Sequence, residues 1–505
     1  MDRFNVVCII ALALLAGLIS SCKKKDVGGV SNTTGWEFGN ADNGGFTVAD
    51  YVEQKTGPGL VLIEGGAFIM GQTQQDVMYD WNNFKRTVTV SSFYMDENEV
   101  SNVDYREYLY WTRRVFGEVY PEVYVKALPD TLVWRKPLAY NEPYVDYYFR
   151  HPAYNNYPVV GISWLQADNY CTWRTDRVNE QILVDEGILD HNPMDQQGDN
   201  NFNTEAYYAG QYEGQVRKKL PSNNPNDPEG GRNVTMEDGI LLPKYQLPTE
   251  AEWEYAALAI IGNSIDERIY SRKLYPWNGH YMRNDTKENL GLMRANFQRG
   301  RGDMMGVAGY LNDNASITSP IDAYWPNDYG LYCMSGNVNE WVRDVFRQVS
   351  FVDVDGFNPF RGNVFKTILR NTDGTIEQKD SLGRIPFREV TLEESMNREN
   401  YQKADNINYN DGDIKSSIVP GGDWNAESGT EERGSNRMYN NGKNNKDANM
   451  SSMVNDHSRV YKGGSWQDRP YWLIPGTRRF LDESKSTRDI GFRCSMLRVG
   501  SPTGY

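Results

Sequence analysis

The chain has 505 residues, and its formal net charge at neutral pH is −15. Proteins that bind nucleic acid need clustered lysine and arginine to displace counterions, so this charge argues against a nucleic-acid partner. Aromatic residues make up 13% of the chain, led by 33 tyrosines and 13 tryptophans. Tyrosine and tryptophan fill space in a core while their polar tips find partners. The length allows one large domain, or a core with insertions.

Residues 1–21 have the features of a secretory signal peptide. An apolar run from Val6 to Ile19 is too short to span a membrane and fits the core of such a signal. It ends in Ile-Ser-Ser-Cys at 19–22, which resembles a bacterial lipobox, where the cysteine is acylated and becomes the first mature residue. Acyl chains contribute about 0.8 kcal/mol of membrane affinity per buried methylene. We therefore predict a lipid anchor on Cys22; a plain secretory signal with an incidental cysteine is the alternative.

Residues 22–57 form a polar, glycine-rich segment after this anchor. The lysines at 23–25 add attraction to anionic head groups. A pure spacer would not need the three aromatic residues Trp36, Phe46 and Tyr51. Two interpretations stay open: a solvated linker, and an arm that docks on the folded body or on a partner.

Folded sequence begins after this segment. The run from Leu60 to Gly71 alternates around a Gly-Gly pair and predicts a β-hairpin. The run over 87–111 predicts a strand, a turn and then a helix from about Asn102, because its aromatic residues recur at helical spacing.

Capping-box patterns mark the start of two later helices. Ser163 is followed three residues later by Gln166, and Thr249 by Glu252. In the second helix we expect one packed face, made by Trp253, Ala256 and Ala257.

Two polar insertions interrupt the body, which we expect to be one domain over 58–505. Residues 195–238 are rich in Asn, Asp, Gln and Gly. The interval near 345–455 is far longer than a loop inside a compact domain should be, and its Asn-rich part is typical of a surface excursion.

Cysteine usage does not suggest a disulfide framework. After removal of the signal and acylation of Cys22, the remaining cysteines are Cys171, Cys333 and Cys494, an odd number without metal-ligand spacing. At most one bridge can form, and we expect these side chains to behave as small buried hydrophobes.

Motifs along residues 58–341 and 458–496 resemble, in the same order, the landmarks of the formylglycine-generating-enzyme (FGE, or sulfatase-modifying-factor) family. They are EGGAFIMG, FYMDENEVSNVDYREYL, YPVVGISWLQADNYCTW, LPTEAEWEYAA, YPWNG, RANF, NDYGLYCMSGNVNEW, GGSW and GFRC. The resemblance implies an α+β fold, the FGE-sulfatase-like variant of the C-type lectin fold, low in regular secondary structure and here carrying long polar insertions.

The same resemblance implies that the family chemistry is absent. Active members place two cysteines a few residues after the Gly-Gly-Ser, and this pair binds copper. Counting without gaps, those positions are Asp468 and Leu473, and the chain has no cysteine between 333 and 494. Because Cu(I) prefers sulfur ligands, we expect no catalytic residue and no copper. The nearby Arg478 and Arg479 are expected to be structural.

Calcium is the cofactor that the resemblance does imply, in a structural role. Oxygen ligands of the kind calcium prefers would form a first site at Asn296, the backbone of Phe297, Asp313 and the backbone of Ala315. A second site would use the backbones of Gly336 and Val338 and the carboxylate of Glu340. The remaining position of the second site falls on Cys333, a poor calcium ligand. The alternative for Glu340 is a buried carboxylate paired with an arginine such as Arg343.

Further segments, including TGWEFGNADNGGF at 34–46 and DTLVWRKPLAYNE at 130–142, resemble the GldJ type of gliding-motility and type IX secretion lipoprotein of Bacteroidetes. In this GldJ/GldK/PorK group, the GldK and PorK types share the lipobox and the FGE-like layout but not the amino-terminal segment. The resemblance implies a non-catalytic scaffold, anchored by its acyl chains in the inner leaflet of the outer membrane and facing the periplasm. The implied partners are GldK/GldN-type ring lipoproteins and periplasmic proteins.

Two other functions stay open. A lectin-like module would bind a sugar or peptide saturably without other envelope components, although fold analogy alone supports it. A divergent FGE-type oxidase would bind copper through Cys333 or Cys494. A scaffold would do neither and would co-purify with large envelope assemblies.

Overall fold

The fold is described from a computed structural model. It describes residues 29–46, 48, 51–72, 83, 85–191, 194, 196–221, 230–261, 273–299, 315–346, 363, 366–390 and 457–500. The predicted signal peptide, Cys22, Asp313 and most of the 345–455 insertion lie outside these residues. Among the described residues, no helix combines the length and the apolar character needed to cross a membrane.

The chain divides into two compact units. The smaller comprises Met1–Gln54, Ile182–His191 and Gln215–Leu241, and the larger comprises Lys55–Gln181, Asn192–Gly214 and Leu242–Tyr505. In the smaller unit, β5 (Leu220–Pro221) pairs with β6 (Gly231–Arg232), and short 3₁₀ turns cover Ala41–Asn43 and Met236–Asp238. The aromatic residues of its amino-terminal segment, Trp36, Phe46 and Tyr51, are exposed.

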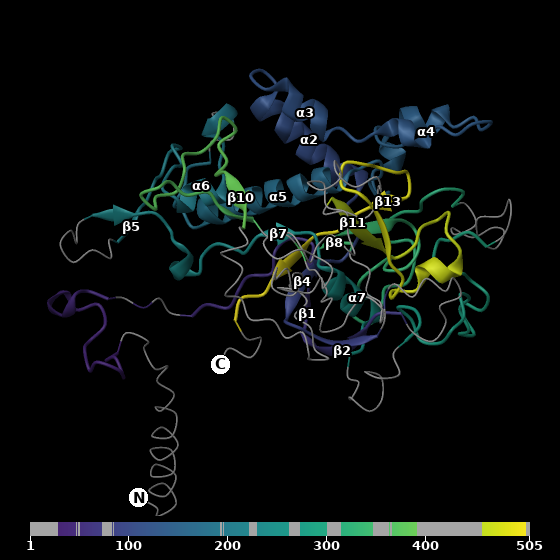
Figure 1. The fold of residues 1–505 in the computed structure, drawn as a ribbon, viewed down its shortest axis with the longest axis horizontal. Helices are drawn as coiled ribbons and strands as arrows, with labels where there is room; N and C mark the ends of the chain where they lie inside the picture. The colour runs from purple at the N-terminus through teal and green to yellow at the C-terminus, as the bar shows by residue number, and fades with distance from the viewer. Residues whose placement is uncertain are drawn as a thin grey trace, which may run out of the picture. The chain divides into compact units, whose positions relative to one another are not determined.

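The larger unit contains two four-stranded sheets built from segments that are far apart in the sequence (Figure 1). The first has the order β1 (Leu60–Ile63), β4 (Phe93–Asp96), β14 (Ser495–Leu497) and β7 (Tyr245–Gln246). The second has the order β12 (Arg479–Asp482), β11 (Ser458–Lys462), β8 (Asn339–Val345) and β13 (Ile490–Gly491). The second sheet therefore brings the NVNEW, GGSW and GFRC motifs together.

The predicted hairpin over 60–71 is wrong. β1 pairs with β4, while β2 (Gly66–Met70) pairs with β3 (Arg86–Val90) in a separate two-stranded sheet. The backbone of Gly65 passes so close to the end of β3 that a Cβ atom there would lie 2.4 Å from the carbonyl oxygen of Val90. The Gly-Gly pair thus allows a close backbone approach rather than a turn.

Sequence patterns at the helix ends correctly predicted where helices begin. α2 (Asn102–Phe116) begins where predicted, with a capping box between Ser101 and Asp104. The predicted box before α5 (Trp164–Asp185) is confirmed, since the Ser163 N–H donates to Gln166 Oε1 at 2.9 Å. The other short elements are α3 (Pro121–Ala127), α4 (Glu142–Tyr147), α6 (Thr204–Tyr208), and the paired strands β9 (Lys366–Ile368) and β10 (Phe387–Glu389).

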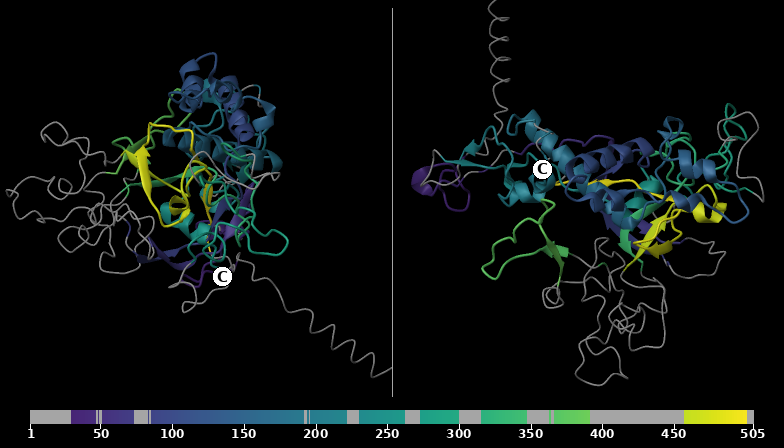
Figure 2. Two further views of the ribbon diagram at one scale, coloured as in Figure 1. Left: turned by 90° about the vertical axis from the view of Figure 1, so that its right-hand side faces the viewer. Right: turned by 90° about the horizontal axis from the view of Figure 1, so that it is seen from above.

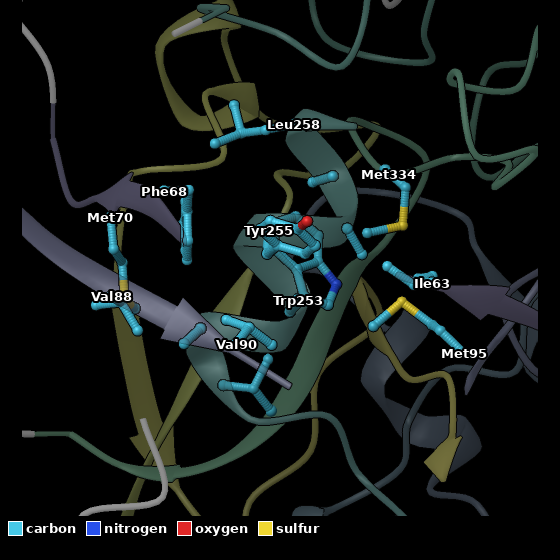
Figure 3. Packing of buried hydrophobic residues seen from close by; sticks show 14 of the residues in the cluster. Ile63, Phe68, Met70, Val88, Val90, Met95, Trp253, Tyr255, Leu258 and Met334 are labelled. Carbon is cyan, nitrogen blue, oxygen red and sulfur yellow. The ribbon is translucent and has the colours of Figure 1, made fainter. Parts of the chain in front are cut away.

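The core of the larger unit forms around α7 (Glu250–Leu258). Its predicted capping box is confirmed, with the Thr249 N–H donating to Glu252 Oε2 at 2.8 Å. The expectation of a single packed face is wrong, because every residue of this helix is buried. Figure 3 shows Trp253 and Tyr255 between two groups of side chains, with Phe68, Met70 and Val88 on one side and Ile63, Met95 and Met334 on the other.

Candidate functional site

Asp468, which the motif count predicts at the first cysteine position of the enzymes, is held in a hydrogen-bonded ion pair. Its Oδ1 accepts a hydrogen bond from Arg479 Nη1 at 2.8 Å, and its Oδ2 accepts one from Arg479 Nη2 at 2.7 Å. Oδ2 also accepts from the hydroxyl of Ser465 at 2.7 Å and from the Ser465 N–H at 2.9 Å. Burial opposes ionisation of this carboxyl, but the hydrogen bonds and charge of Arg479 outweigh it and lower the pKa of Asp468. Asp468 is therefore a fixed anion.

The guanidinium of Arg479, at the start of β12, is also held by several partners. Its guanidinium lies over the rings of Tyr461 and Trp472, at 4.9 and 4.7 Å from their centroids, and Nη2 also donates to Asn339 Oδ1. Burial alone would lower the pKa of Arg479, but the hydrogen bond and charge of Asp468 raise it. The pair joins the loop after Gly-Gly-Ser to β12, which is a structural task.

Leu473, which the motif count predicts at the second cysteine position, lies in the apolar core. It is fully buried in a cluster with Tyr275, Met293, Ala295, Phe297, Ala315, Tyr324, Cys333 and Ile474. The carbonyl oxygen of Leu473 accepts a hydrogen bond from the hydroxyl of Ser335 at 2.6 Å. An ion-paired carboxylate and a packed leucine offer no soft ligand for copper.

The three remaining cysteines are buried and free, as expected. The Sγ atoms of Cys171 and Cys494 lie 3.4 Å apart, and the Cys333 thiol contacts the Ile321 carbonyl oxygen at 3.4 Å. Burial raises the pKa of Cys171 and of Cys333, which disfavours the thiolate that binds metal. Within the described part of the chain, no group of three or more His, Cys, Asp or Glu side chains could hold a metal ion.

Glu340, expected in the second calcium site, has a different set of partners. Its Oε1 accepts from Arg493 Nη2 at 2.7 Å, and its Oε2 accepts from Arg493 Nε and from Trp253 Nε1, each at 2.7 Å. All three side chains are fully buried. Since both carboxylate oxygens are occupied, the donor set does not fit calcium. The alternative of a buried carboxylate–arginine pair describes Glu340 better, but the arginine is Arg493 rather than Arg343.

Glu99 adds a second carboxylate to this buried pair. It accepts hydrogen bonds from Asn337 Nδ2 at 2.6 Å and from the Val338 N–H at 3.4 Å. Burial, and then the nearby charge of Glu340, raise the pKa of Glu99 well above its ordinary value, against the opposing charge of Arg493. A single guanidinium thus faces two carboxyls, and Glu99 favours its protonated form.

In the first calcium site, the side-chain oxygen of Asn296 fits a cation. Asn296 is fully buried, and its Nδ2 donates to the Ile317 carbonyl oxygen at 2.9 Å, while its Oδ1 has no hydrogen-bond partner among the described residues. An unpartnered buried oxygen is costly, and it is the ligand type that calcium prefers. Phe297 and Ala315 lie in one cluster with each other. Asp313 lies outside the described residues.

The residues predicted for the two calcium sites are neighbours. The Asn337 N–H donates to the Asn296 carbonyl oxygen at 2.9 Å, and a Cβ on Gly336 would lie 2.4 Å from that same oxygen. Gly336 has φ +84°, so the close approach requires glycine there. The loop of Gly336 and Val338 thus packs directly on Asn296.

Sequence reasoning missed a buried charge cluster beside this region. Lys462, immediately before Gly-Gly-Ser, contacts Glu250 Oε1 at 3.1 Å and Glu254 Oε2 at 2.7 Å, and Arg478 contacts Glu250 at 2.7 Å. The Gly71 N–H donates to Glu254 at 2.8 Å. Glu250 and Glu254, four residues apart in a helix whose other charged residue is the capping Glu252, were the available signal. The cluster ties α7 to β11 and to the loop that carries Asp468.

Comparison with known proteins identifies the family of this chain. Residues 45–496 match the family described as the sulfatase-modifying factor enzyme 1-like domain, FGE-sulfatase. The chain belongs to this family. The predicted FGE-type fold, with mixed helix and strand, is therefore confirmed at the level of the family.

Relatives in the family include both enzymes and proteins named inactive. The chain is 26% identical to the formylglycine-generating enzyme of Mus musculus, over 59% of the chain and 61% of that enzyme. It is 26% identical to the inactive C-alpha-formylglycine-generating enzyme 2 of Bos taurus, over 64% of the chain and 86% of the relative. It is 25% identical to the chaperone protein LppX of Paenibacillus barcinonensis, over 56% of the chain and 70% of the relative. The chain thus spans about three fifths of the length of the mouse enzyme.

Proposed function

We propose that this protein is a non-catalytic scaffold lipoprotein of the outer membrane, a component of gliding motility and type IX secretion in Bacteroidetes. The observation that carries the non-catalytic part is the pair of residues at the cysteine positions. Asp468 is bound by Arg479, and Leu473 is packed in the core. The existence of relatives named inactive supports the same conclusion. The fold would be the FGE variant of the C-type lectin fold.

The anchor and location in this proposal rest on the lipobox-like sequence. Acylated Cys22 would hold the protein in the inner leaflet of the outer membrane, and the adjacent lysines in place of an acidic motif favour the periplasmic face. The partners would be GldK/GldN-type ring lipoproteins and periplasmic proteins. The calcium site at Asn296 would be structural, cross-linking loops in a fold with few regular elements.

The helical segment from α2 to α4 supports a role in partner contacts. It exposes nine large apolar side chains, and exposed apolar patches commonly mark interaction sites. They are Val103, Tyr110, Val119, Val125, Leu128, Leu132, Leu138, Tyr140 and Tyr147. Leu138 is fully exposed and has φ +63°, a conformation that leucine rarely adopts. The loop between Trp134 and α4 therefore presents Leu138 at a local energetic cost.

An affinity pull-down of the tagged, lipidated protein from gently solubilised envelopes tests the proposal. We expect stoichiometric recovery of outer-membrane lipoproteins and periplasmic ring proteins, identified by mass spectrometry. The variant L138S should recover less of them, while V499S, which changes another exposed apolar residue outside this segment, should not. Recovery of the protein alone, under conditions in which a secretion ring stays intact, would contradict the scaffold role.

A further inference from the structure

A second region of the larger unit has the features of a binding site. A cleft of about 530 Å³ lies between α5, β7 and the hairpin of β9 and β10. Its volume is in the range of small-ligand and peptide sites. Five cationic side chains line it: Lys244, Arg343, Lys366, Arg384 and Arg459.

The hairpin that forms one wall is fixed to the body. Its connecting loop binds the segment around α6, where Asn201 Nδ2 donates to the Leu382 carbonyl oxygen at 2.8 Å. Gln211 makes two further bonds, accepting from the Lys379 N–H at 2.7 Å and donating to the Glu377 carbonyl oxygen at 3.0 Å. Figure 1 shows this green hairpin beside α6, and Figure 2 shows the same green hairpin from two other directions. The wall is thus preformed, which reduces the ordering cost of binding.

The cations of this cleft are only partly neutralised by the protein. Lys244 pairs with Glu205 at 2.6 Å, and Arg459 pairs with Glu483 at 2.8 Å. The other three, Arg343, Lys366 and Arg384, make no ion pair in the described part of the chain.

The carboxylates that line the cleft are fewer: Asp168, Asp176 and Glu205. Asp176 accepts hydrogen bonds from the Thr204 N–H at 2.8 Å and from Asn203 at 3.1 Å. Asp168 faces the charges of Arg459, Arg343 and Lys366, which oppose the rise that burial causes in its pKa. Among the described side chains that line the cleft, cations therefore outnumber carboxylates by five to three, in a chain whose net charge is −15.

We propose that this cleft binds an acidic peptide segment through its carboxylates. Carboxylates form short, strong hydrogen bonds with guanidinium and ammonium groups. The lining also contains Asn169, Thr172 and Gln246, whose amide and hydroxyl groups suit a peptide backbone.

An acidic saccharide fits the lining less well. Sugars stack on open aromatic faces, but a cationic side chain already lies over each aromatic ring that lines the cleft. Arg459 lies 3.8 Å from the ring centroid of Trp164, Arg174 lies 4.5 Å from that of Tyr245, and Lys244 lies 5.0 Å from that of Phe387. Binding of an acidic peptide in this cleft does not depend on the scaffold role, so either proposal can fail without the other.

Fluorescence anisotropy with a labelled hexaglutamate peptide tests the site, using the mature, lipidated chain in detergent. We expect saturable binding that weakens as salt is added, and no binding of hexaglutamine. Each of the variants K366E and R384E should raise the Kd at least tenfold. The matched control is R370E, which reverses an exposed charge on the same hairpin outside the cleft and should leave the Kd unchanged. Unaltered unfolding curves would show that the variants are folded.

Three results would overturn the proposal. The first is no binding of hexaglutamate. The second is the same Kd for K366E, R384E and the control R370E. The third is tighter binding of oligogalacturonate than of hexaglutamate, with the same dependence on Lys366 and Arg384. The last result would assign the cleft to an acidic saccharide instead. Should K366E or R384E fail to fold, the neutral variants K366Q and R384Q serve the same comparison, with a smaller expected increase in Kd.

Discussion

Asp468 and Arg479 form a two-point ion pair, with the carboxylate and guanidinium joined by hydrogen bonds of 2.8 and 2.7 Å. Counting from Gly-Gly-Ser predicts that Asp468 stands where the enzymes of this family carry their first cysteine. This relationship leads to predictions about stability rather than catalysis.

Removing this carboxylate should destabilise the fold. Asp468→Ala leaves Arg479 without its anion and Ser465 without its acceptor, and the two side chains of the pair are only 12% and 20% exposed. Breaking buried pairs costs about 3–5 kcal/mol, and this partly accessible pair should lie near 3 kcal/mol. Urea unfolding measures the loss. Glu142→Ala, which removes a surface partner of Arg135, is the control and should have little effect. Equal effects of the two variants would contradict a structural role for Asp468.

The buried Glu99 should make stability depend on pH. Its pKa is raised in the folded state, so the native protein keeps a proton that the unfolded chain releases. The free energy of unfolding should therefore fall as pH rises from the unfolded pKa of about 4.3 toward the folded value, by at most about 1.4 kcal/mol per pH unit.

Glu99→Gln should flatten this dependence, because glutamine does not titrate. Urea unfolding across mildly acidic to mildly alkaline pH provides the measurement, and Glu97→Gln, at an exposed neighbour, is the control. An unchanged slope in Glu99→Gln would show that the native protein does not hold this proton.

A calcium ion bound at Asn296 should stabilise the protein. A ligand that binds only the folded state raises stability by about 2.7 kcal/mol at one hundred times its Kd. We expect calcium to raise the Tm of chelator-treated protein and Asn296→Ala to abolish that response. Asn284→Ala, at another buried asparagine, is the matched control and should keep it. A calcium response that survives Asn296→Ala would place the ion elsewhere.

The buried thiols should be unreactive in the native protein. Burial raises the pKa of both Cys171 and Cys333, and the thiolate is the reactive species. In a soluble form that begins after Cys22, a thiol-specific reagent should label no cysteine before unfolding and Cys171, Cys333 and Cys494 after it. Rapid labelling of the native protein would contradict the packing. Labelling of Cys333 alone after unfolding would indicate a disulfide between the other two.

Local chemistry in the sequence predicted helix starts, but not strand partners. The capping residues Ser163 and Thr249 act within three residues of themselves, so their role could be read from the chain. The pairing of β1 with β4 depends on how distant segments pack, and the Gly-Gly pair that suggested a hairpin serves a close backbone approach instead.

In the candidate site, too, positions within a motif could be predicted from the sequence, but distant partners could not. Counting from Gly-Gly-Ser predicted Asp468 and Leu473 at the two cysteine positions, and neither side chain is a soft ligand for copper. The partner of Glu340 could not be predicted, because Arg493 lies 153 residues away and becomes a neighbour only when β13 joins β8. Arg343 is close in sequence, but the backbone of β8 directs it to Gln246.

A titration with Cu(I) shows whether this chain binds copper at all. The soluble, reduced protein would be titrated with Cu(I) against a chromogenic chelator, beside a formylglycine-generating enzyme as positive control. We expect no stoichiometric Cu(I) binding by this chain, since Asp468 is bound to Arg479, Leu473 is buried in the core and the three thiols are packed in the interior. One equivalent of tightly bound Cu(I) that is lost in Cys333→Ser or Cys494→Ser would contradict the account and restore the oxidase.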